Sequence, residues 1–471
     1  MPFYQAPHRP TFTSLLRSFG HGPGLPFRQA LPQQLIDRLA HEEGVHFGDD
    51  PGDVYTPAVT LWAFLTQCLG DTKSCVAAVA RVIVLCVSLS RPPCAASTGA
   101  YCKARAKLPV RFLQRLTYQV GQSLEEQAQQ SWLWHGRRVQ LVDGACLSAP
   151  DTPENQAVYP QPRSRPAGLG FPLIRLVVLL TFATAALVGA AYGPYQGKET
   201  GETALFRTLL EQIQAEDLVV ADRYYCSYWQ IALLRQRQAD VAFRLHQRRH
   251  SDFRRGKRLG RYDHVVTWTK PSRPEWMTEE MYASLPAELS LREVRVTVTT
   301  PGVRTRVLTV VTSLLNATTY SREAIADLYH QRWHVELDLR SIKQTLHMEV
   351  LSCKTPEMLE KEIWVHLLGY NLVRQALAQA AVERGVPPRQ LSFAGGVQTL
   401  NAFRWLLQCS EEEQWAFACQ VLYVALGTHQ VGDRPNRVEP RRLKRHRQKY
   451  SWLRQPRAQA RAELLSGRVA E

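Results

Sequence analysis

Four polar residues recur at helical spacing within residues 329–346, and they are Tyr329, Arg332, Glu336 and Lys343. They are separated by three, four and seven positions. On an α-helix, which turns about 100° per residue, such side chains fall within roughly 60° of one another. One carboxylate beside a phenol and two cations can be a ladder of surface ion pairs, because i, i+3 and i, i+4 contacts are common on helices. The spacing alone does not separate this alternative from a chemical site.

An apolar stripe adjoins these polar residues and consists of Leu328, Val335, Leu339, Ile342 and Leu346. The pattern is typical of a helix that is buried on one side. The four polar residues are therefore expected at the edge of a core-facing surface.

Two aspartates end apolar runs that predict buried strands. Asp143 closes the run VQLVD, and Asp222 closes DLVVAD. An acidic side chain at the C-terminal end of a buried strand is costly unless it is paired, metal-bound or at the surface rim, and ligand sites in α/β sheets favour these strand ends. Each aspartate alone could be a loop or cap residue. Together with Glu336 they offer three carboxylates from three elements.

Carboxylate oxygens suit Mg²⁺ or Mn²⁺ better than zinc or copper. Two such ions can activate an attacking hydroxyl group and stabilise a leaving oxygen in phosphodiester chemistry. The three carboxylates therefore predict a metal-dependent reaction on a phosphodiester.

Positive charge is concentrated in two segments of the chain. The 471 residues carry a formal net charge of +16 with a pI near 9.5, whereas residues 244–261 carry +7 and residues 434–461 carry +10. Two concentrated basic segments on a nearly neutral body indicate a polyanionic partner. Neither segment has an apolar helical face, which favours nucleic acid over a membrane, although two solvated charged segments would look the same.

Cysteine usage and hydropathy argue against several other classes of protein. The ten cysteines include no C-x-x-C pair, which disfavours a zinc site, and the N-terminal 20 residues lack the apolar core of a secretory signal. A reducing cytoplasm therefore fits best. Residues 176–192 are uncharged, yet they predict two buried strands joined near Thr184 or Ala185; a membrane span there is the remote alternative.

The order of these patterns predicts a mixed α/β fold, because strands are followed by strand–helix–strand units. Residues 97–124 resemble a short helical pair whose basic residues meet either DNA or only solvent. The expected divisions are a helical N-terminal DNA-binding region at 1–135, the first part of a catalytic domain at 136–245, a β-rich insertion at 246–312, the second part of the catalytic domain at 313–385, and a helical region with a basic tail at 386–471.

The chain resembles the DDE transposases of bacterial insertion sequences, in the group called the insertion sequence four family. The signature of that family, Tyr-x2-Arg-x3-Glu-x6-Lys, is matched at every position by the four polar residues above. VDGACLSAPDTPEN resembles the first-aspartate segment of the family and implies Asp143. ADRYYCSYW resembles the second and implies Asp222, although Tyr224 stands where the family more often has glycine. The resemblance covers residues 97–450.

This resemblance implies a ribonuclease-H-like catalytic domain that is interrupted by a β-rich insertion, with helical regions at both ends. It implies Asp143, Asp222 and Glu336 as catalytic residues and as ligands of Mg²⁺ or Mn²⁺, with two ions expected. The implied activity is cleavage of double-stranded DNA at the terminal inverted repeats of an element and strand transfer into target DNA, through a hairpin intermediate. Pairing of two ends implies at least a dimer, and no membrane partner is expected.

The remaining residues of the signature, Tyr329, Arg332 and Lys343, are expected to hold DNA phosphates, since arginine clamps phosphate with two hydrogen bonds and lysine supplies a compact charge. Trp268 or Trp276 is a candidate to hold a flipped base, although either could be a core residue. Further DNA contacts are expected at Arg105, Lys107, Arg248, Arg249, Arg254, Arg255, Lys257, Arg441, Arg442, Lys444 and Arg445.

Two other functions fit parts of the sequence. A related nuclease on the same fold would cleave DNA without strand transfer. An inactive relative would act as a DNA-binding regulator, but a protein that only binds DNA has no use for three convergent acids.

Overall fold

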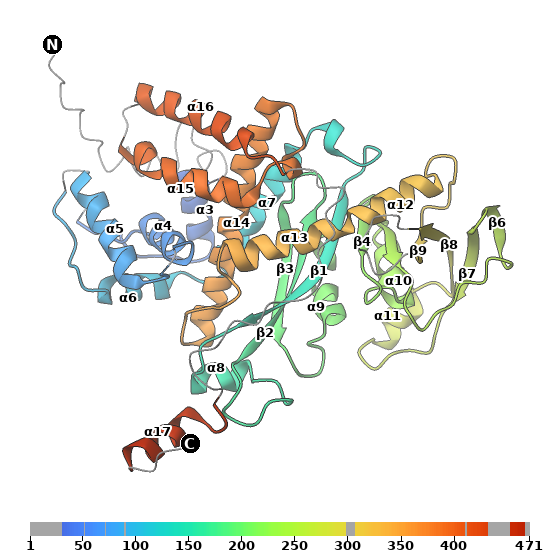
Figure 1. Ribbon diagram of the computed structural model, residues 1–471, viewed down its shortest axis with the longest axis horizontal. Coiled ribbons are helices and arrows are strands. Elements are labelled where there is room, and N and C mark those ends of the chain that lie inside the picture. Colours follow the sequence, from blue (N-terminus) through green and yellow to red (C-terminus); the bar gives the residue numbers. More distant parts are fainter. Residues whose placement is uncertain are drawn as a thin grey trace.

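Nine strands form one sheet that runs through the molecule, with helices packed around it (Figure 1). The structure is a computed structural model that describes residues 31–50, 52–70, 72–88, 91–297, 307–409, 412–431 and 453–466. Across the sheet the strands follow the order β3–β2–β1–β4–β5–β9–β8–β7–β6. Their bounds are β1 Val139–Ser148, β2 Leu173–Thr181, β3 Leu187–Pro194, β4 Leu218–Ala221, β5 Asp240–Arg244, β6 Lys257–Gly260, β7 Asp263–Thr269, β8 Glu288–Thr297 and β9 Val307–Thr312.

Strands β1, β4 and β5 are parallel, and every other neighbouring pair in the sheet is antiparallel. The parallel strands are covered on both faces, which is why their sequences contain continuous apolar runs such as LVVA in β4. Parallel neighbours end at the same edge of the sheet, and this edge carries Asp222. A mixed α/β fold, as predicted, is what the structure shows.

Strands β2 and β3 form the hairpin that the apolar segment 176–192 predicts. They pair from Ile174 with Pro194 to Leu180 with Leu187, and the turn between them contains Ala185 at a φ of 59°. The hydroxyl of Tyr370 donates to the carbonyl oxygen of Ala185 at 3.0 Å, so the turn is fixed by a helix packed over it. Within the described ranges no helix is both long and apolar enough to cross a membrane.

Residues 246–312 contain β6 to β9 and helix α11 (Glu279–Ser284), and these strands extend the sheet beyond β5 through β9. A buried ion pair joins β7 to β8, with Nη2 of Arg292 at 2.5 Å from Oδ2 of Asp263. Nη1 of the same arginine donates to the carbonyl oxygen of Tyr320 at 2.7 Å, just before the next helix. The added strands are therefore tied to the segment that leads into the signature helix.

The signature segment follows a helical path made of four successive pieces. They are α12 Arg322–His330, η3 Gln331–Trp333, α13 His334–Arg340 and the π-helical η4 Ser341–Thr345. All five members of the predicted apolar stripe are buried, with exposures between 0% and 6%. Helix α13 packs against β1, so this path crosses the sheet at the parallel strands (Figure 1).

The described helices pack on the sheet and on one another. On the N-terminal side they are α3 Gln33–Glu42, α4 Pro57–Cys68, α5 Cys75–Ser88, α6 Gly99–Lys107, α7 Val110–Glu126 and η1 Gln130–Trp132. Within and beside the sheet they are α8 Pro153–Val158, α9 Glu202–Thr208, η2 Leu210–Gln212 and α10 Tyr228–Gln236. Toward the C-terminus they are α14 Pro356–Arg384, η5 Pro388–Gln390, α15 Phe393–Cys409, α16 Glu412–Thr428 and α17 Arg457–Leu465.

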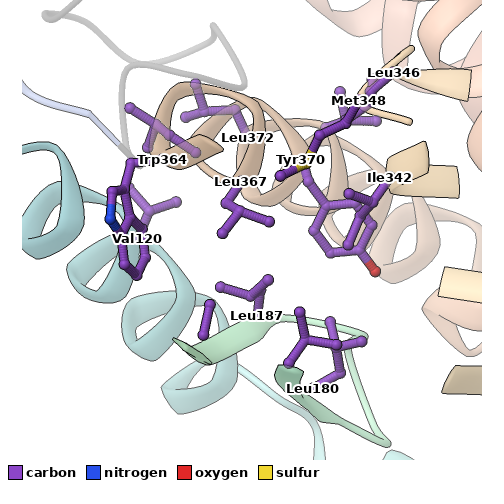
Figure 2. Close-up of a cluster of buried hydrophobic side chains, with 14 of the residues drawn as sticks. Val120, Leu180, Leu187, Ile342, Leu346, Met348, Trp364, Leu367, Tyr370 and Leu372 are labelled. Carbon is purple, nitrogen blue, oxygen red and sulfur yellow. The ribbon is translucent and has the colours of Figure 1, made fainter. Parts of the chain in front are cut away.

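The 29-residue helix α14 is the centre of the larger core. Figure 2 shows Leu367 and Tyr370 of α14 near Leu187 of β3, with Val120 of α7 close by. Asn371 donates from Nδ2 to the carbonyl oxygen of Leu187 at 2.8 Å and so binds α14 to β3. Because α14 is packed on almost all sides, it is a rigid support for the elements that contact it.

Candidate active site

Asp143 and Asp222 lie level with one another on neighbouring parallel strands. The pairing of β1 with β4 reaches Leu141 and Val220, and two more residues along each chain bring the two aspartates side by side. Asp143 ends the apolar run of β1 but not the strand itself, which continues to Ser148 as the partner of β2. Strand β4 ends at Ala221, one residue before Asp222. The second aspartate therefore follows the end of its own strand and lies beside β1, which continues.

Glu336 approaches Asp143 from helix α13, and Arg332 links the two carboxylates. Nη2 of Arg332 donates to Oε1 of Glu336 at 2.5 Å, while Nη1 lies 3.8 Å from Oδ2 of Asp143. The Arg332 side chain is only 18% exposed. The i, i+4 ion pair expected of a surface ladder is thus present between Arg332 and Glu336. However, the arginine is largely buried, and it also lies near Asp143 of the sheet. A surface ladder does not account for this arrangement.

The carboxyl group of Asp143 is held in an unfavourable environment for a negative charge. Burial is the largest cause and raises the pKa of Asp143 from its ordinary 3.8 to about 6. The amide N–H of Gly144, at 2.8 Å from Oδ1, and the charge of Arg332 both oppose this rise, whereas Asp222 and Glu336 add to it. The negative charges of Asp222 and Glu336 therefore act on Asp143, and Arg332 is the cation that lies against Asp143 and Glu336. One arginine does not balance three acids, so the group keeps an excess of negative charge.

The donor set fits a hard divalent cation, since it consists of carboxylate oxygens and a cation would supply the missing positive charge. Among the residues that the structure describes, no three Asp, Glu, His or Cys side chains are arranged to hold one metal ion. The acids are brought together as a charged group, with Arg332 against two of them.

Tyr329 and Lys343 take different places around this group. Tyr329 is 6% exposed; burial raises the pKa of its hydroxyl, and Arg332 and Asp222 are the charges that act on it most strongly. Lys343 pairs with Glu349, Nζ lying 3.2 Å from Oε1. The tyrosine is therefore buried and under the charges of Arg332 and Asp222, whereas the lysine is paired further along the helix.

Asp338 holds the helix that carries Glu336, and the sequence interpretation missed it. This carboxylate is 1% exposed and accepts from Nη2 of Arg374 at 2.6 Å and from Nη1 of Arg389 at 2.9 Å. Arg374 belongs to α14, and Arg389 donates from Nη2 to the carbonyl oxygen of Thr181 in β2 at 2.8 Å. The signal was present, because residue 338 falls on the apolar stripe between positions 335 and 342, where an acid needs a buried partner.

The basic loop, residues 245–256 between β5 and β6, is exposed at its charged positions. Arg254 and Arg255 are 89% and 85% exposed at the side chain, and both face Asp252. Arg248 and Lys257 are exposed as well. A partner can therefore reach the side chains of this segment that are predicted to contact phosphates. Asp252 offsets part of their positive charge.

The two candidate tryptophans differ. Trp268 is 6% exposed, its Nε1 donates to Glu293 at 3.3 Å, and the guanidinium of Arg249 lies 3.8 Å from the ring centre, so it is a core side chain. Trp276 is half-buried, with the guanidinium of Arg207 at 3.8 Å from its ring centre. Of the two, Trp276 keeps a ring that a base could reach, and its role stays a prediction.

The other predicted DNA contacts are dispersed. Arg105 is packed inward over the ring of Phe64 and donates to Oε1 of Gln67 at 2.8 Å, while the ammonium of Lys107 lies 5.3 Å from the ring centre of Phe47. The predicted contacts of the basic tail lie outside the described residues, and they are Arg441, Arg442, Lys444 and Arg445.

Replacing Asp338 with Asn should destabilise the fold, because Arg374 and Arg389 would stay buried without a counter-charge. Removing one partner of a buried ion pair costs about 3–5 kcal/mol of unfolding free energy. We expect a decrease of that size in urea unfolding of D338N. Asp327→Asn, on the exposed face of α12, is the control and should stay within about 0.5 kcal/mol of wild type. A stable D338N would show that these ion pairs do not hold the helix.

The raised pKa of Asp143 gives a second prediction, which concerns the stability of the fold measured in the presence of EDTA. Between pH 3.8 and about 6 the folded state binds more protons than the unfolded chain, so this group makes stability fall as the pH rises through that window. Asp143→Asn removes the effect. At pH 8 the variant should be more stable than wild type by up to about 3 kcal/mol, and the difference should vanish near pH 4. Thermal unfolding across this range checks it; a less stable variant at pH 8 would contradict it.

The chain is similar to known transposases over its central part. The model of the Transposase DDE domain family matches residues 134–372. The chain is 31% identical over 268 residues to Transposase InsG for insertion sequence element IS4 of Escherichia coli K12, covering 55% of this chain and 57% of that relative. It is 39% identical over 54 residues to the putative transposase InsL for IS186A of the same organism, covering 12% of this chain and 15% of that relative. The chain thus matches only part of the length of these relatives.

Among solved structures, the chain resembles the piggyBac transposase in a synaptic complex with hairpin DNA, with a TM-score of 0.40 and 9% identity over 88% of this chain and 85% of that one. A likeness this weak adds nothing to the assignment. The family match carries it, since it spans half of the chain and contains all three acids and the whole signature. The chain belongs to the family of DDE transposases, in agreement with the resemblance seen in its sequence.

Proposed function

We propose that the protein is a transposase that uses Asp143, Asp222 and Glu336 to cut DNA at the ends of an insertion sequence and to join the freed ends to target DNA. One observation carries the proposal. The register of β1 with β4 brings two aspartates level, and Arg332 joins the first of them to the signature glutamate. Three acids from separate parts of the chain thus act on one another in a family whose members are transposases.

We further infer that strands β1 to β5 form a ribonuclease-H-like core. Supporting this is their order, β3–β2–β1–β4–β5, with an antiparallel three-stranded part followed by two parallel strands. In this proposal residues 136–245 and 313–385 form the catalytic domain and 246–312 the insertion. Residues 1–135 and 386–471 are the flanking helical regions, of which the first would bind DNA.

Asp143, Asp222 and Glu336 would hold Mg²⁺ or Mn²⁺, and two ions are the number we propose. Bound there, divalent ions supply a Lewis acid and lower the pKa of water. The chain itself contributes position and charge: Arg332 offsets two of the acids, and the buried Tyr329 is under the charges of Arg332 and Asp222. In the first step water attacks the phosphorus at the end of the element, the bond to the 3′ oxygen breaks, and that oxygen leaves as a 3′-hydroxyl.

The freed 3′-hydroxyl then attacks the opposite strand and displaces the 3′ oxygen of the flanking DNA, which closes a hairpin on the end of the element. Water reopens the hairpin and regenerates the 3′-hydroxyl, which attacks the target. The basic segment 244–261 is the proposed DNA path. It leaves the sheet at the end of β5, the parallel neighbour of β4, and hence at the edge that carries Asp222. Two ends processed together require at least two copies of the chain, and the proposed location is the nucleoid of a bacterial cell.

Glu336→Gln tests the proposed catalysis. It keeps the size of the side chain and removes its charge, so cleavage of a duplex carrying the terminal repeat of the element should fall by at least about a hundredfold with Mg²⁺, because metal-dependent stabilisation supplies several kcal/mol. The matched control is Glu323→Gln in α12, a glutamate that is 72% exposed and also paired with an arginine. Cleavage by E336Q within tenfold of the control would remove Glu336 from the mechanism.

The basic loop gives a separate test, measured as the salt dependence of duplex binding by fluorescence anisotropy. Each phosphate that the protein neutralises contributes about 0.9 to the slope of log K against log salt. The double variant Arg254→Gln, Arg255→Gln should therefore make the slope shallower by roughly 1.8. The control is Arg235→Gln, Arg237→Gln, which removes two exposed arginines at the end of α10, one of them also paired with an aspartate. Equal slopes for both double variants would place the DNA away from this loop.

A further inference from the structure

A buried polar group on β7 and β8 contacts the basic loop. His264 of β7 stands opposite Glu293 in the register of the two strands, and Nε2 of its ring lies 3.2 Å from Oε2 of Glu293. The other carboxylate oxygen, Oε1, accepts from Nε1 of Trp268 at 3.3 Å. The side chains of His264 and Glu293 are only 1% and 7% exposed. Because buried polar groups are costly without partners, contacts of this kind fix the side chains that make them.

The main chain of the basic loop is attached to this group through His264. Nδ1 of the ring lies 2.7 Å from the carbonyl oxygen of Arg255, an atom that can only accept, so this nitrogen carries a proton. The ring of Phe253, also in the loop, packs on the imidazole with 4.6 Å between the ring centres. Gly256 follows with a φ of 77°, and a Cβ atom there would lie 2.2 Å from the carbonyl oxygen of Val265. The end of the loop therefore lies closely against β7.

A second contact holds an earlier part of the loop. The guanidinium of Arg249 lies 3.8 Å from the ring centre of Trp268, a cation–π contact with the ring whose N–H is bound to Glu293. The loop is thus held at two places by members of one buried group. The side chains of Arg254 and Arg255 nevertheless remain exposed. A loop with a fixed main chain and exposed cations is suited to a partner that carries regularly spaced negative charges.

The opposite face of the same two strands is tied to the signature segment. Asp263 and Arg292 are the sequence neighbours of His264 and Glu293, and successive residues of a strand point to opposite faces. Arg292 binds Asp263 and also donates to the carbonyl oxygen of Tyr320, just before α12. One pair of strands therefore connects the basic loop with the signature segment through two buried polar groups, one on each face.

We propose that His264 is a positioning residue for DNA, because it holds the basic loop in the conformation in which Arg254 and Arg255 meet phosphates. Protonated on both nitrogens, its ring donates to the loop and to Glu293, and Trp268 fixes that carboxylate. The three buried side chains touch no DNA and act only through the loop. This inference rests on the proposed function, since it takes the basic loop as part of the DNA path.

The test is a double-mutant cycle on the affinity of the full-length protein for a duplex that carries the terminal repeat, measured by fluorescence anisotropy. His264→Gln keeps an amide donor for Glu293 but leaves the carbonyl oxygen of Arg255 without its donor. Losing the hydrogen bond that orders the loop should weaken binding about fivefold. In the Arg254→Gln, Arg255→Gln background the same substitution should change the affinity by less than about twofold, because residues that act through one another are not additive.

The matched background is Arg235→Gln, Arg237→Gln, which also removes two exposed arginines. There the fivefold loss caused by H264Q should persist. Equal losses in all three backgrounds would overturn the inference, because they would show a general weakening of the protein and no action through the loop. Unchanged affinity of H264Q in the wild-type background would overturn it as well.

The loop variant Arg254→Gln, Arg255→Gln by itself separates this inference from the proposed function. If it binds DNA like wild type, the basic loop is not the DNA path, and the inference falls with that part of the proposed function. If it binds more weakly while H264Q binds like wild type, only the role of His264 is overturned.

If H264Q does not fold, Phe253→Leu decides. It removes the ring that packs on His264 and leaves the buried polar group intact. A loss of affinity that appears only where Arg254 and Arg255 are present supports the inference. No loss, or the same loss in all three backgrounds, overturns it.

Discussion

One buried carboxylate, that of Asp338, fixes where the signature helix lies relative to the sheet. Glu336 itself is 57% exposed, and Arg332 is the side chain that holds it. Two residues later in the same helix, Asp338 binds Arg374 of α14 and Arg389, which also reaches a carbonyl oxygen of β2. Since β2 is the neighbour of β1, these contacts set the position of Glu336 relative to Asp143. The buried ion pairs of Asp338 thus hold this helix in place, while the functional side of the helix faces solvent.

The acids of the site oppose the stability of the fold. The charges of Asp222 and Glu336 add to the cost of ionising the buried Asp143, and Arg332 lies against only two of the three acids. Perturbed groups of this kind cluster at functional sites, where like charges are kept close for chemistry rather than for stability. The surrounding scaffold therefore has to be rigid, and the sheet register and α14 provide that rigidity.

Local patterns in the sequence pointed to the candidate residues of the site but not to the groups that hold them in place. Strand-like apolar runs ending in Asp143 and Asp222, and the helical spacing of Glu336, reflect local patterns that a chain carries within a few residues. The pairing of β1 with β2 and β4, which sets the two aspartates level, could not be seen, because it joins residues far apart in the chain. Partners of Asp338 come from positions 36 and 51 residues away, a relation that no local pattern encodes. Similarly, the burial of Trp268 and the inward packing of Arg105 on Phe64 follow from tertiary packing alone.

The proposed binding of a divalent cation between β1, the end of β4 and α13 can be tested directly with Fe²⁺ in place of Mg²⁺. With ascorbate and peroxide, hydroxyl radicals cut the polypeptide next to the bound iron. We expect cuts in three separate segments, around residues 143, 222 and 336, that excess Mg²⁺ suppresses. Cuts confined to other segments, or cuts that Mg²⁺ leaves unchanged, would contradict it.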